Sequence, residues 1–563
     1  MNSHKKRIHF YTLACVLVAV KLWFLTAYDL VAISAPQDDL YFVKLATHLA
    51  SGEWLGPLNQ VTLSKGAFYP LFITVCYWLG IPLMVGQQLL WWLACLVFCA
   101  ALFPISKRPT LFYLVFVFLL LLPSTYYFPA TARVLRLNVY APLAFLTLSS
   151  LLGLMLRARW PWKKQLIWAC AAGLCFSLFW HTREESLFLL PSLLLIFLYH
   201  LICQFKADNS LRSVLSTCML YAISATLFFA ISSGISYQNS RHYDIDATLD
   251  SRTPEFKSAY GSLLSIRTDS WRQFFPVVEE ARRQAYAASP AFKELEPYLE
   301  GVVGKKWMSL GGIGDIHAAF FPWAFRDAVY SAGYYQEGMS TLDFYRRMGQ
   351  ELKGACEDGR LDCSLPTVSL LSGWHEEFNQ LVIPTWLQII TRAVSFTDFS
   401  TDTEEKLSRG PAESMVLFET ITREKLQPSK RLILNNMPEY HKDLNKEKTR
   451  VLNDVSSFYR MVMPVLCSVA LCCVLFSLLR SLVQRVWITP LLIISLAALS
   501  GVLAITFILT LLTITSYDEI TRALQVAYPL LVLFVITAFL DITLWWRQQP
   551  HAPVQQADGD PFL

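Results

Sequence analysis

The sequence predicts an α-helical polytopic membrane protein with a largely helical extracytoplasmic domain. Hydrophobic residues make up 54% of the 563 residues and charged residues only 16%, against roughly 25% charged residues in soluble domains. The chain also has 17 Trp, as expected where many helix ends lie at a lipid–water interface. Apolar segments on both sides of one large polar region indicate about 10–11 transmembrane segments.

A helix needs about 20 largely apolar residues to cross the hydrocarbon core. The candidate segments are 10–33, 67–83, 84–105, 110–128, 137–157, 165–180, 187–204, 214–236, 456–481, 486–513 and 523–546. The first could be a signal peptide, because "AISA" before Pro36 resembles a cleavage site. A signal h-region is roughly 7–15 residues long and this run is longer, so we favour an uncleaved anchor.

Basic clusters set the orientation, because Lys and Arg gather on the cytoplasmic side. The clusters are "HKKR" at 4–7, "SKR" at 106–108, "RARWPWKK" at 157–164, "KADNSLR" at 206–212, "RSLVQR" at 480–485 and "WWRQQ" at 545–549. All are cytoplasmic only if 67–105 makes one net crossing. Segment 67–83 is short and contains Pro70, Gly80 and Pro82. We interpret it as re-entrant or interfacial, which leaves ten full spans; if it crosses fully, one basic cluster lies on the wrong side.

This orientation divides the chain into four parts. They are an N-terminal transmembrane module (1–236) with a first outer loop (34–66), an extracytoplasmic domain (237–455), C-terminal transmembrane helices (456–546) and a disordered cytoplasmic tail (547–563). The loops 129–136, 181–186 and 514–522 fall on the same outer face as 34–66 and 237–455. Polar side chains of all these loops therefore meet on one side of the membrane.

In the polar region 237–455, apolar residues recur three and four apart, which favours amphipathic helices. We expect one helix in "SPAFKELEPYLEGVV" and another in "STLDFYRRMGQELKGACEDG", with Gly354 and Gly359 as terminators. Cys356 and Cys363 lie in this region, whereas the other eleven of 13 cysteines lie in or beside apolar spans. An oxidising compartment favours a disulfide between the two, although their spacing also fits two free thiols.

Two adjacent carboxylates, Asp38 and Asp39, follow the first span in "APQDDLYFVKLATHLASGEW". Asp is a preferred N-cap, and the residues after it form an amphipathic pattern closed by Gly52. Capping, close to the positive end of the helix, explains one carboxylate. The second carboxylate is then available for catalysis. The alternative interpretation is that the acidic pair serves only to cap the helix.

Basic residues gather on the same outer face, against the usual positive-inside bias. The turn "FWHTREESLF" contains Arg183 and Glu184, "ATARVLRLNVY" contains Arg133 and Arg136, and "SYDEITRALQVAYPLL" contains Arg522. Arg suits two-pronged binding of phosphate, so an anionic ligand at the membrane surface accounts for the cluster. Ordinary interfacial ion pairs are the alternative.

Several classes of function lack support. No Walker loop and no G-x-G-x-x-G after a predicted strand occur, which disfavours an ATP-driven pump or a Rossmann enzyme. "GDIHAAF" (Asp315, His317) and "WHEEF" (His375, Glu376, Glu377) lack a third ligand at a recognisable spacing, so we expect no metal. The net charge of +5 gives no reason to expect nucleic acid. We expect no cofactor.

The order of segments, with a cytoplasmic N-terminus, one span and then an acidic outer loop with a short helix, resembles the C-type glycosyltransferase (GT-C) superfamily. Protein O-mannosyltransferases and lipid A aminoarabinose transferases belong to it. Such relatives show an acidic pair, a Tyr about three residues on, a Gly-containing helix end and a Lys-Pro-Pro-like start to the next segment. Here these are Asp38–Asp39, Tyr41, "ASGEW" and "SKGAFYPLF".

Two positions depart from that pattern. Gly66 and Ala67 stand where the relatives often carry prolines, and Asn138 in "RLN" stands where several carry another Asp. A role that relies on this additional acid therefore does not transfer to the chain. The large region 237–455 is also unlike the compact C-terminal domain of some members.

The resemblance implies a glycosyltransferase, either hexosyl- or pentosyltransferase. It would move a sugar from a polyprenyl-phosphate donor to a hydroxyl of an unknown glycan, lipid or protein acceptor. A carboxylate near that hydroxyl is a suitable general base in an inverting reaction. We expect Asp38 to be the base and Asp39 to be a helix cap or an acceptor ligand, with exchanged roles as the alternative.

Cationic side chains stabilise the departing lipid phosphate. Arg183 and Arg522 are the expected phosphate ligands, and Lys65 and Arg136 are further candidates. Glu184 is expected to fix Arg183 rather than to react.

Three alternatives remain open at this level. A transporter or flippase would place ionisable residues at membrane depth, but the chain has Lys21 inside its first span and few other charges at that depth. A polysaccharide polymerase or ligase would use lipid-linked glycans without needing Asp38, and a degenerate relative would only bind them.

The outer region contains no N-x-Ser/Thr sequon, which favours a bacterial inner membrane with the large loop in the periplasm.

Overall fold

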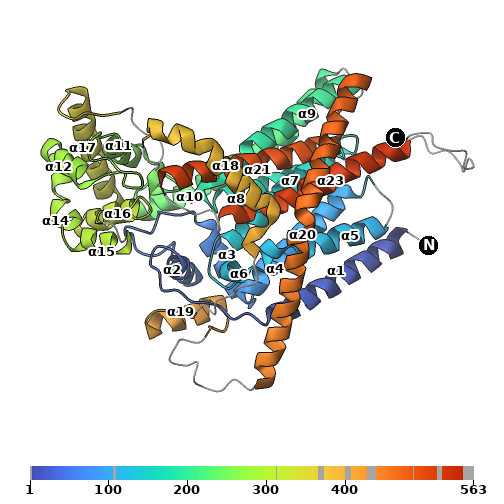
Figure 1. The fold of residues 1–563 in the computed structure, drawn as a ribbon, viewed down its shortest axis with the longest axis horizontal. Helices are drawn as coiled ribbons and strands as arrows, with labels where there is room; N and C mark the ends of the chain where they lie inside the picture. Colours follow the sequence, from blue (N-terminus) through green and yellow to red (C-terminus); the bar gives the residue numbers. More distant parts are fainter. Residues whose placement is uncertain are drawn as a thin grey trace, which may run out of the picture.

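The computed structural model describes residues 3–105, 109–208, 210–311, 314–364, 373–399, 407–427, 439–485, 487–516 and 523–548. Within these ranges every regular element is an α-helix or a short 3₁₀ helix, and β-pairing is limited to isolated bridges. The predicted α-helical fold is confirmed. Figure 1 shows a bundle of long helices with a group of short helices at one end, while the start of α1 and the end of α23 lie at the other.

Eight helices of the described residues are long and apolar enough to cross a membrane. They are α1 (Ser3–Leu25), α4 (Leu83–Leu102), α7 (Leu137–Met155), α9 (Leu190–Asp208) preceded by η2 (Glu184–Leu189), α10 (Leu211–Tyr243), α20 (Glu439–Gln484), α21 (Pro490–Thr515) and α23 (Ala527–Gln548) preceded by η6 (Leu524–Val526). A pair bent by 52° is either a ninth, broken span or a re-entrant loop: α5 (Pro109–Leu120), then η1 (Pro123–Thr125) and α6 (Phe128–Thr131). The remaining predicted span, 165–180, corresponds to α8 (Trp162–Trp180), a 19-residue helix with Lys163 and Lys164 in its first turn, which is not among these apolar helices.

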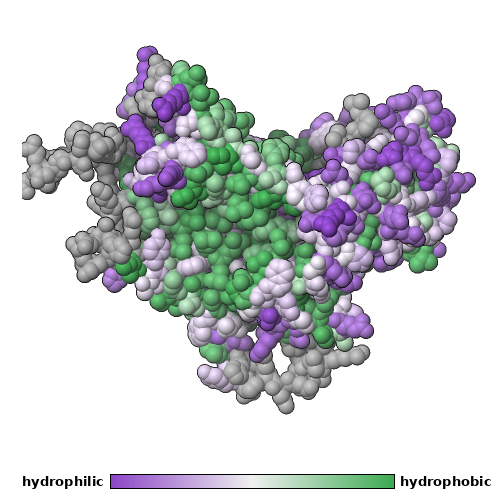
Figure 2. Space-filling model, turned by 180° about the vertical axis from the view of Figure 1, so that it is seen from behind, coloured by the Kyte–Doolittle hydropathy of each residue, from purple (hydrophilic) through white to green (hydrophobic). Residues whose placement is uncertain are grey.

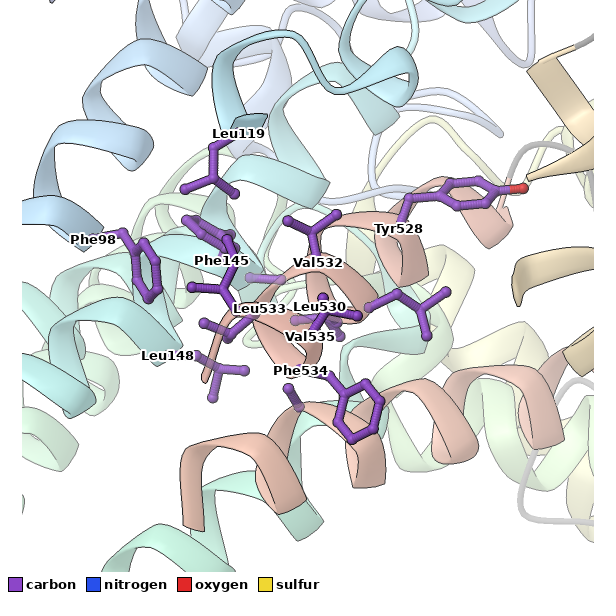
Figure 3. Close-up of a cluster of buried hydrophobic side chains, with 14 of the residues drawn as sticks. Phe98, Leu119, Phe145, Leu148, Tyr528, Leu530, Val532, Leu533, Phe534 and Val535 are labelled. Carbon is purple, nitrogen blue, oxygen red and sulfur yellow. The ribbon is translucent and has the colours of Figure 1, made fainter. Parts of the chain in front are cut away.

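The centre of the bundle is formed by α7 and α23, because 94% and 83% of the residues in their most apolar stretches are buried. Figure 3 shows part of this core, where Phe98 of α4 and Phe145 of α7 lie beside Leu533 of α23. The rings of Phe98 and Phe145 are 5.3 Å apart. Because lipid tails are as apolar as leucine, close packing of this kind is what holds helices together in a bilayer.

The outside of the bundle is apolar over a wide surface (Figure 2). Large apolar side chains point outward from many of its helices, for example Val16, Leu114, Ile167, Leu198 and Phe229. Soluble monomers rarely expose a contiguous apolar patch of more than a few hundred Å². This surface is therefore the part that contacts lipid, and the protein is an integral membrane protein.

The first apolar run is helical only as far as Leu25, whereas the sequence predicted one segment over 10–33. Beyond the helix, Leu30 and Ile33 form parallel bridges with Leu426 and Arg409, far along the chain. Hydropathy does not separate a helix from an extended segment whose backbone groups are paired elsewhere. The prediction was therefore too long by about two turns.

Two short helices follow the first span, α2 (Asp39–Ala50) and α3 (Phe68–Trp78). The 11 residues of α3 rise about 16 Å at 1.5 Å per residue, about half of the hydrocarbon thickness. Gly80 then adopts a φ of +71° and Pro82 precedes α4. A re-entrant or interfacial α3 fits these dimensions.

Residues 250–364 form a group of short helices that we call the helical domain. It comprises η3 (Asp250–Arg252), α11 (Pro254–Leu264), α12 (Glu279–Ala288), α13 (Pro290–Lys293), α14 (Glu296–Leu299), α15 (Val302–Gly311), α16 (Phe321–Ser331) and α17 (Gly338–Glu357). Its own core is rich in buried aromatic rings, among them Phe256, Phe325 and Tyr345. Cys356, in the last turn of α17, forms a disulfide with Cys363 in the segment that follows, with a Cα–Cα distance of 5.6 Å.

One of the two helices predicted in this domain differs from the structure. The stretch "SPAFKELEPYLEGVV" is not one helix but three short pieces, α13, α14 and the start of α15. Pro297 lies in the first turn of α14, where it suits a helix start and prevents continuation from α13. The other predicted helix is present as α17, and Gly359 has a φ of +74° just beyond its end.

Residues 373–399 and 407–427 lie against the bundle again. They contain η4 (Glu376–Phe378), α18 (Asn379–Ser395), η5 (Thr397–Phe399) and α19 (Ala412–Thr422). Helix α18 packs on α21, and α19 packs on α2 and α3. The predicted outer region 237–455 therefore holds the helical domain and also segments that support the bundle.

Candidate active site

The acidic pair stands at the start of α2, at the end of the bundle that faces the helical domain (Figure 1). Asp38 occupies the N-cap position, but its side chain makes no capping hydrogen bond. Asp39, the expected cap, is instead the first helical residue and is fully buried. Both carboxylates instead contact cations from other segments. A hydrogen bond between two charged groups is stronger than a capping bond to a backbone N–H.

Arg133 is the partner of Asp39. Its Nε lies 3.1 Å from Asp39 Oδ2, and its Nη2 contacts the other oxygen of the same carboxylate. The Nη2 atom also lies 3.7 Å from Asp38 Oδ2. The guanidinium is only 9% exposed, so the segment before α7 is joined to the start of α2 by a buried ion pair.

Lys65 is the second cation beside Asp38. Its Nζ donates to Asp38 Oδ1 at 3.3 Å and to the backbone oxygen of Gln37 at 2.5 Å. Burial lowers the pKa of Lys65, and the charge of Asp38 acts in the opposite direction. The hydroxyl of Tyr41 donates to the backbone oxygen of Thr62 at 3.1 Å and fixes the loop that carries the lysine.

Gly66 explains one departure from the GT-C pattern. A Cβ at this position would lie 2.0 Å from the backbone oxygen of His181, so only glycine lets the two segments approach. The N–H of Phe68 donates to the same oxygen at 3.4 Å. The loop that carries Lys65 and Gly66 and the turn 181–186 are therefore held against each other.

The turn 181–186 carries two ion pairs. Arg136 donates to Glu184 at 2.8 Å and to the backbone oxygen of Thr182 at 2.9 Å. Arg183 donates through two nitrogens to Glu185, at 2.8 and 3.0 Å. The expectation that Glu184 fixes Arg183 was therefore wrong: Arg183 is extended just before η2 and binds Glu185, while Glu184 binds Arg136.

Asn138, the other departure, has a structural role. Its side-chain nitrogen donates to the backbone oxygen of Ala130 at 3.0 Å, within the bend that positions Arg133. Arg522, the remaining predicted phosphate ligand, lies outside the described residues.

The helical domain adds two residues that sequence reasoning missed. Trp323 of α16 has its ring centroid 5.6 Å from Lys65 Nζ. Arg252 of η3 lies 5.6 Å from the ring of Trp180. Burial lowers the pKa of Arg252, and the charge of Glu184 opposes this shift. Neither residue belongs to a motif, and only the fold brings Trp323 to the first outer loop and Arg252 to Trp180, just before the turn 181–186.

Side chains of the two histidine-containing stretches contact other protein groups. Asp315 accepts hydrogen bonds from Arg282 and from the backbone of Glu279, and His375 stacks on Trp271. Across the ranges that the structure covers, no group of three His, Cys, Asp or Glu side chains is arranged to hold a metal ion.

No family model matches the chain, and no curated protein sequence matches it. Two crystal structures of ArnT from Cupriavidus metallidurans are similar to it. The apo structure aligns at 13% identity over 95% of this chain and 78% of ArnT, with a TM-score of 0.32. The structure bound to undecaprenyl phosphate aligns at 12% identity over 96% of this chain and 77% of ArnT, with a TM-score of 0.29. The likeness is distant and extends over nearly the whole chain.

Proposed function

We propose that this protein transfers a sugar from a polyprenyl-phosphate carrier to an acceptor hydroxyl at the membrane surface. The observation that carries the proposal is the environment of Asp38. Its side chain is 29% exposed, whereas that of Asp39 is fully buried, and Lys65 and Arg133 lie 3.3 and 3.7 Å from its two oxygens. One accessible carboxylate is thus held among cations at the end of a membrane bundle.

The proposed reaction is a single inverting displacement in which Asp38 is the general base. The acceptor hydroxyl gives its proton to Asp38 while its oxygen forms a bond to the anomeric carbon of the donor. The bond from that carbon to the phosphate oxygen breaks, and the polyprenyl phosphate leaves with the electron pair. Asp39 does not take part directly, because it is buried against Arg133, and it positions Asp38 and the arginine.

Lys65 is the first candidate to contact the departing phosphate, because it is the lysine closest to Asp38. A fixed cation stabilises the negative charge that develops on the leaving group. When the phosphate attracts the ammonium, Asp38 loses part of its counter-charge and accepts a proton more readily. Arg136 and Arg183, each already bound to a carboxylate, and Arg522 are the further phosphate candidates.

We place the bundle in a bacterial inner membrane with the site and the helical domain in the periplasm. The prenyl chain of the donor would lie along the apolar outer surface, with its head group at the site. A disulfide persists in that oxidising compartment, and the helical domain contains one, Cys356–Cys363. Residues 237–455 would cover the site or recruit the acceptor.

The test compares Asp38→Asn with a matched control, Glu53→Gln, at the other end of α2. Glu53 is 63% exposed and pairs only with His48 among its described contacts. Both variants are purified in detergent and assayed for transfer from radiolabelled polyprenyl-phosphate sugars, with undecaprenyl phosphate as one carrier. We expect Asp38→Asn to lose about 10²–10⁴-fold in rate and the control to keep its rate. Full transfer by Asp38→Asn would exclude the mechanism and favour a polymerase or ligase chemistry.

A further inference from the structure

The ammonium of Lys65 lies in an aromatic cage that two parts of the chain build together. Its Nζ is 5.2 Å from the ring centroid of Phe42 and 5.9 Å from that of Tyr41, both in α2. The third ring is that of Trp323, 5.6 Å away, in the helical domain. An ammonium within about 6 Å of a ring centroid is attracted by the negative face of the ring, most strongly for Trp.

Helix α16, which carries Trp323, is tied to the loop that carries Lys65. The side chain of Gln60 donates to Asp327 Oδ1 at 3.2 Å. Arg326 forms a buried ion pair with Asp250, and the backbone N–H of Asp250 donates to the oxygen of Leu63 at 3.2 Å. These contacts fix the indole ring relative to the lysine whenever the helical domain is docked.

The Lys65 ammonium is attracted both by the aromatic rings of the cage and by nearby carboxylates. Asp38 attracts it directly, Glu184 adds a weaker favourable charge, and Arg136 opposes both. Burial lowers the pKa of Lys65, so the aromatic rings offset part of the hydration that the ammonium has lost.

We propose that Trp323 is a positioning residue, which holds the Lys65 ammonium beside Asp38 so that docking of the helical domain completes the site. This inference rests on the proposed function, in which Lys65 meets the donor phosphate. The helical domain thereby acts on the reaction through one cation and needs no direct contact with Asp38.

The test uses the full-length protein with Trp323→Leu and the conservative variant Trp323→Phe. Tyr330→Leu is the control, because Tyr330 is an exposed aromatic residue on the same helix. The pH at which the Lys65 amine becomes reactive is measured by acylation and mass spectrometry. We expect Trp323→Leu to lower this pH by about half a unit to one unit, Trp323→Phe to restore most of it, and the control to leave it unchanged.

The pH dependence of transfer gives the second measurement. The alkaline limit of kcat/KM should move to lower pH in Trp323→Leu and return in Trp323→Phe. A shift of the Lys65 reactivity to higher pH overturns the proposal, because the ring would then act only by excluding water from the ammonium. No shift also overturns it, because the ring would then have no effect on the lysine. Since the acylation measurement needs no activity, it separates failure of this inference from failure of the proposed reaction, which Asp38→Asn tests.

Discussion

Arg133 binds Asp39 through two nitrogens, and both side chains are shielded from water, at 9% and 0% exposure. The pair joins the start of α2 to the bend before α7, across 94 positions of the sequence. A buried pair of this kind is costly to break from one side, because the remaining charge stays in a poorly hydrated place.

The first prediction follows from the cost of removing one partner of this buried pair. Asp39→Asn should lower the free energy of unfolding by about 3–5 kcal/mol, since it takes from the buried Arg133 guanidinium the carboxylate that it binds through two nitrogens and leaves the longer contact with Asp38. The double variant Asp39→Asn with Arg133→Gln should regain part of this loss. Thermal unfolding in detergent measures both. Equal stability of Asp39→Asn and the parent protein contradicts the assignment of this pair as structural.

The second prediction concerns the pairing in the turn 181–186. Arg183 and Glu185 should show a coupling energy of about 0.5–3 kcal/mol in a double-mutant cycle, because they share two hydrogen bonds. Arg183 and Glu184 should be additive within about 0.3–0.5 kcal/mol. The variants Arg183→Gln, Glu185→Gln and Glu184→Gln and their pairs are compared by unfolding. A larger coupling to Glu184 contradicts the observed geometry.

The sequence predicted the bundle well, because a transmembrane helix is specified by a local property, a long apolar run. It also placed Asp38, Lys65 and Arg136 on one face, since alternation of spans fixes the side of each loop. Its helix limits failed at residues 26–33, where the apolar residues serve an extended segment paired with residues 409 and 426.

The contacts inside the site were much less predictable. Arg133 was one of several outer arginines, and nothing local distinguishes it as the partner of Asp39. Trp323 lies 258 positions from Lys65 in a region with no recognised motif. Such contacts depend on how the helical domain docks, and a pattern of hydrophobic spacing carries no information about docking.

The third prediction concerns the disulfide of the helical domain. Its two cysteines are seven positions apart, and closing so short a loop contributes roughly 2–3 kcal/mol to stability. The variant Cys356→Ser with Cys363→Ser should therefore make the helical domain more sensitive to limited proteolysis on heating. Transfer at temperatures well below unfolding should persist, because the bond lies at the C-terminal end of α17 and not at the acidic pair. Loss of transfer without loss of stability contradicts this separation.

The last prediction is a dependence of stability on pH that arises far from the acidic pair. Glu424, in the segment after α19, accepts a hydrogen bond from the N–H of Met84 at 2.6 Å, in the first turn of α4. Burial raises the pKa of Glu424 to about 7, the charge of Asp29 adds to the rise, and the bond to Met84 opposes it. In the unfolded chain a glutamate titrates near its ordinary value of about 4.3.

Between those two pH values the folded protein binds more protons at this site than the unfolded chain, so the free energy of unfolding falls as the pH rises. The contribution of Glu424 should be most favourable below pH 4.3 and be lost above about pH 7. Glu424→Gln keeps an acceptor for the Met84 N–H and should flatten this slope, making the variant more stable than the parent at pH 8. Thermal unfolding from pH 5 to 8 measures the effect, with exposed Glu419→Gln on α19 as the control. The same slope in Glu424→Gln and the parent shows that another group is responsible.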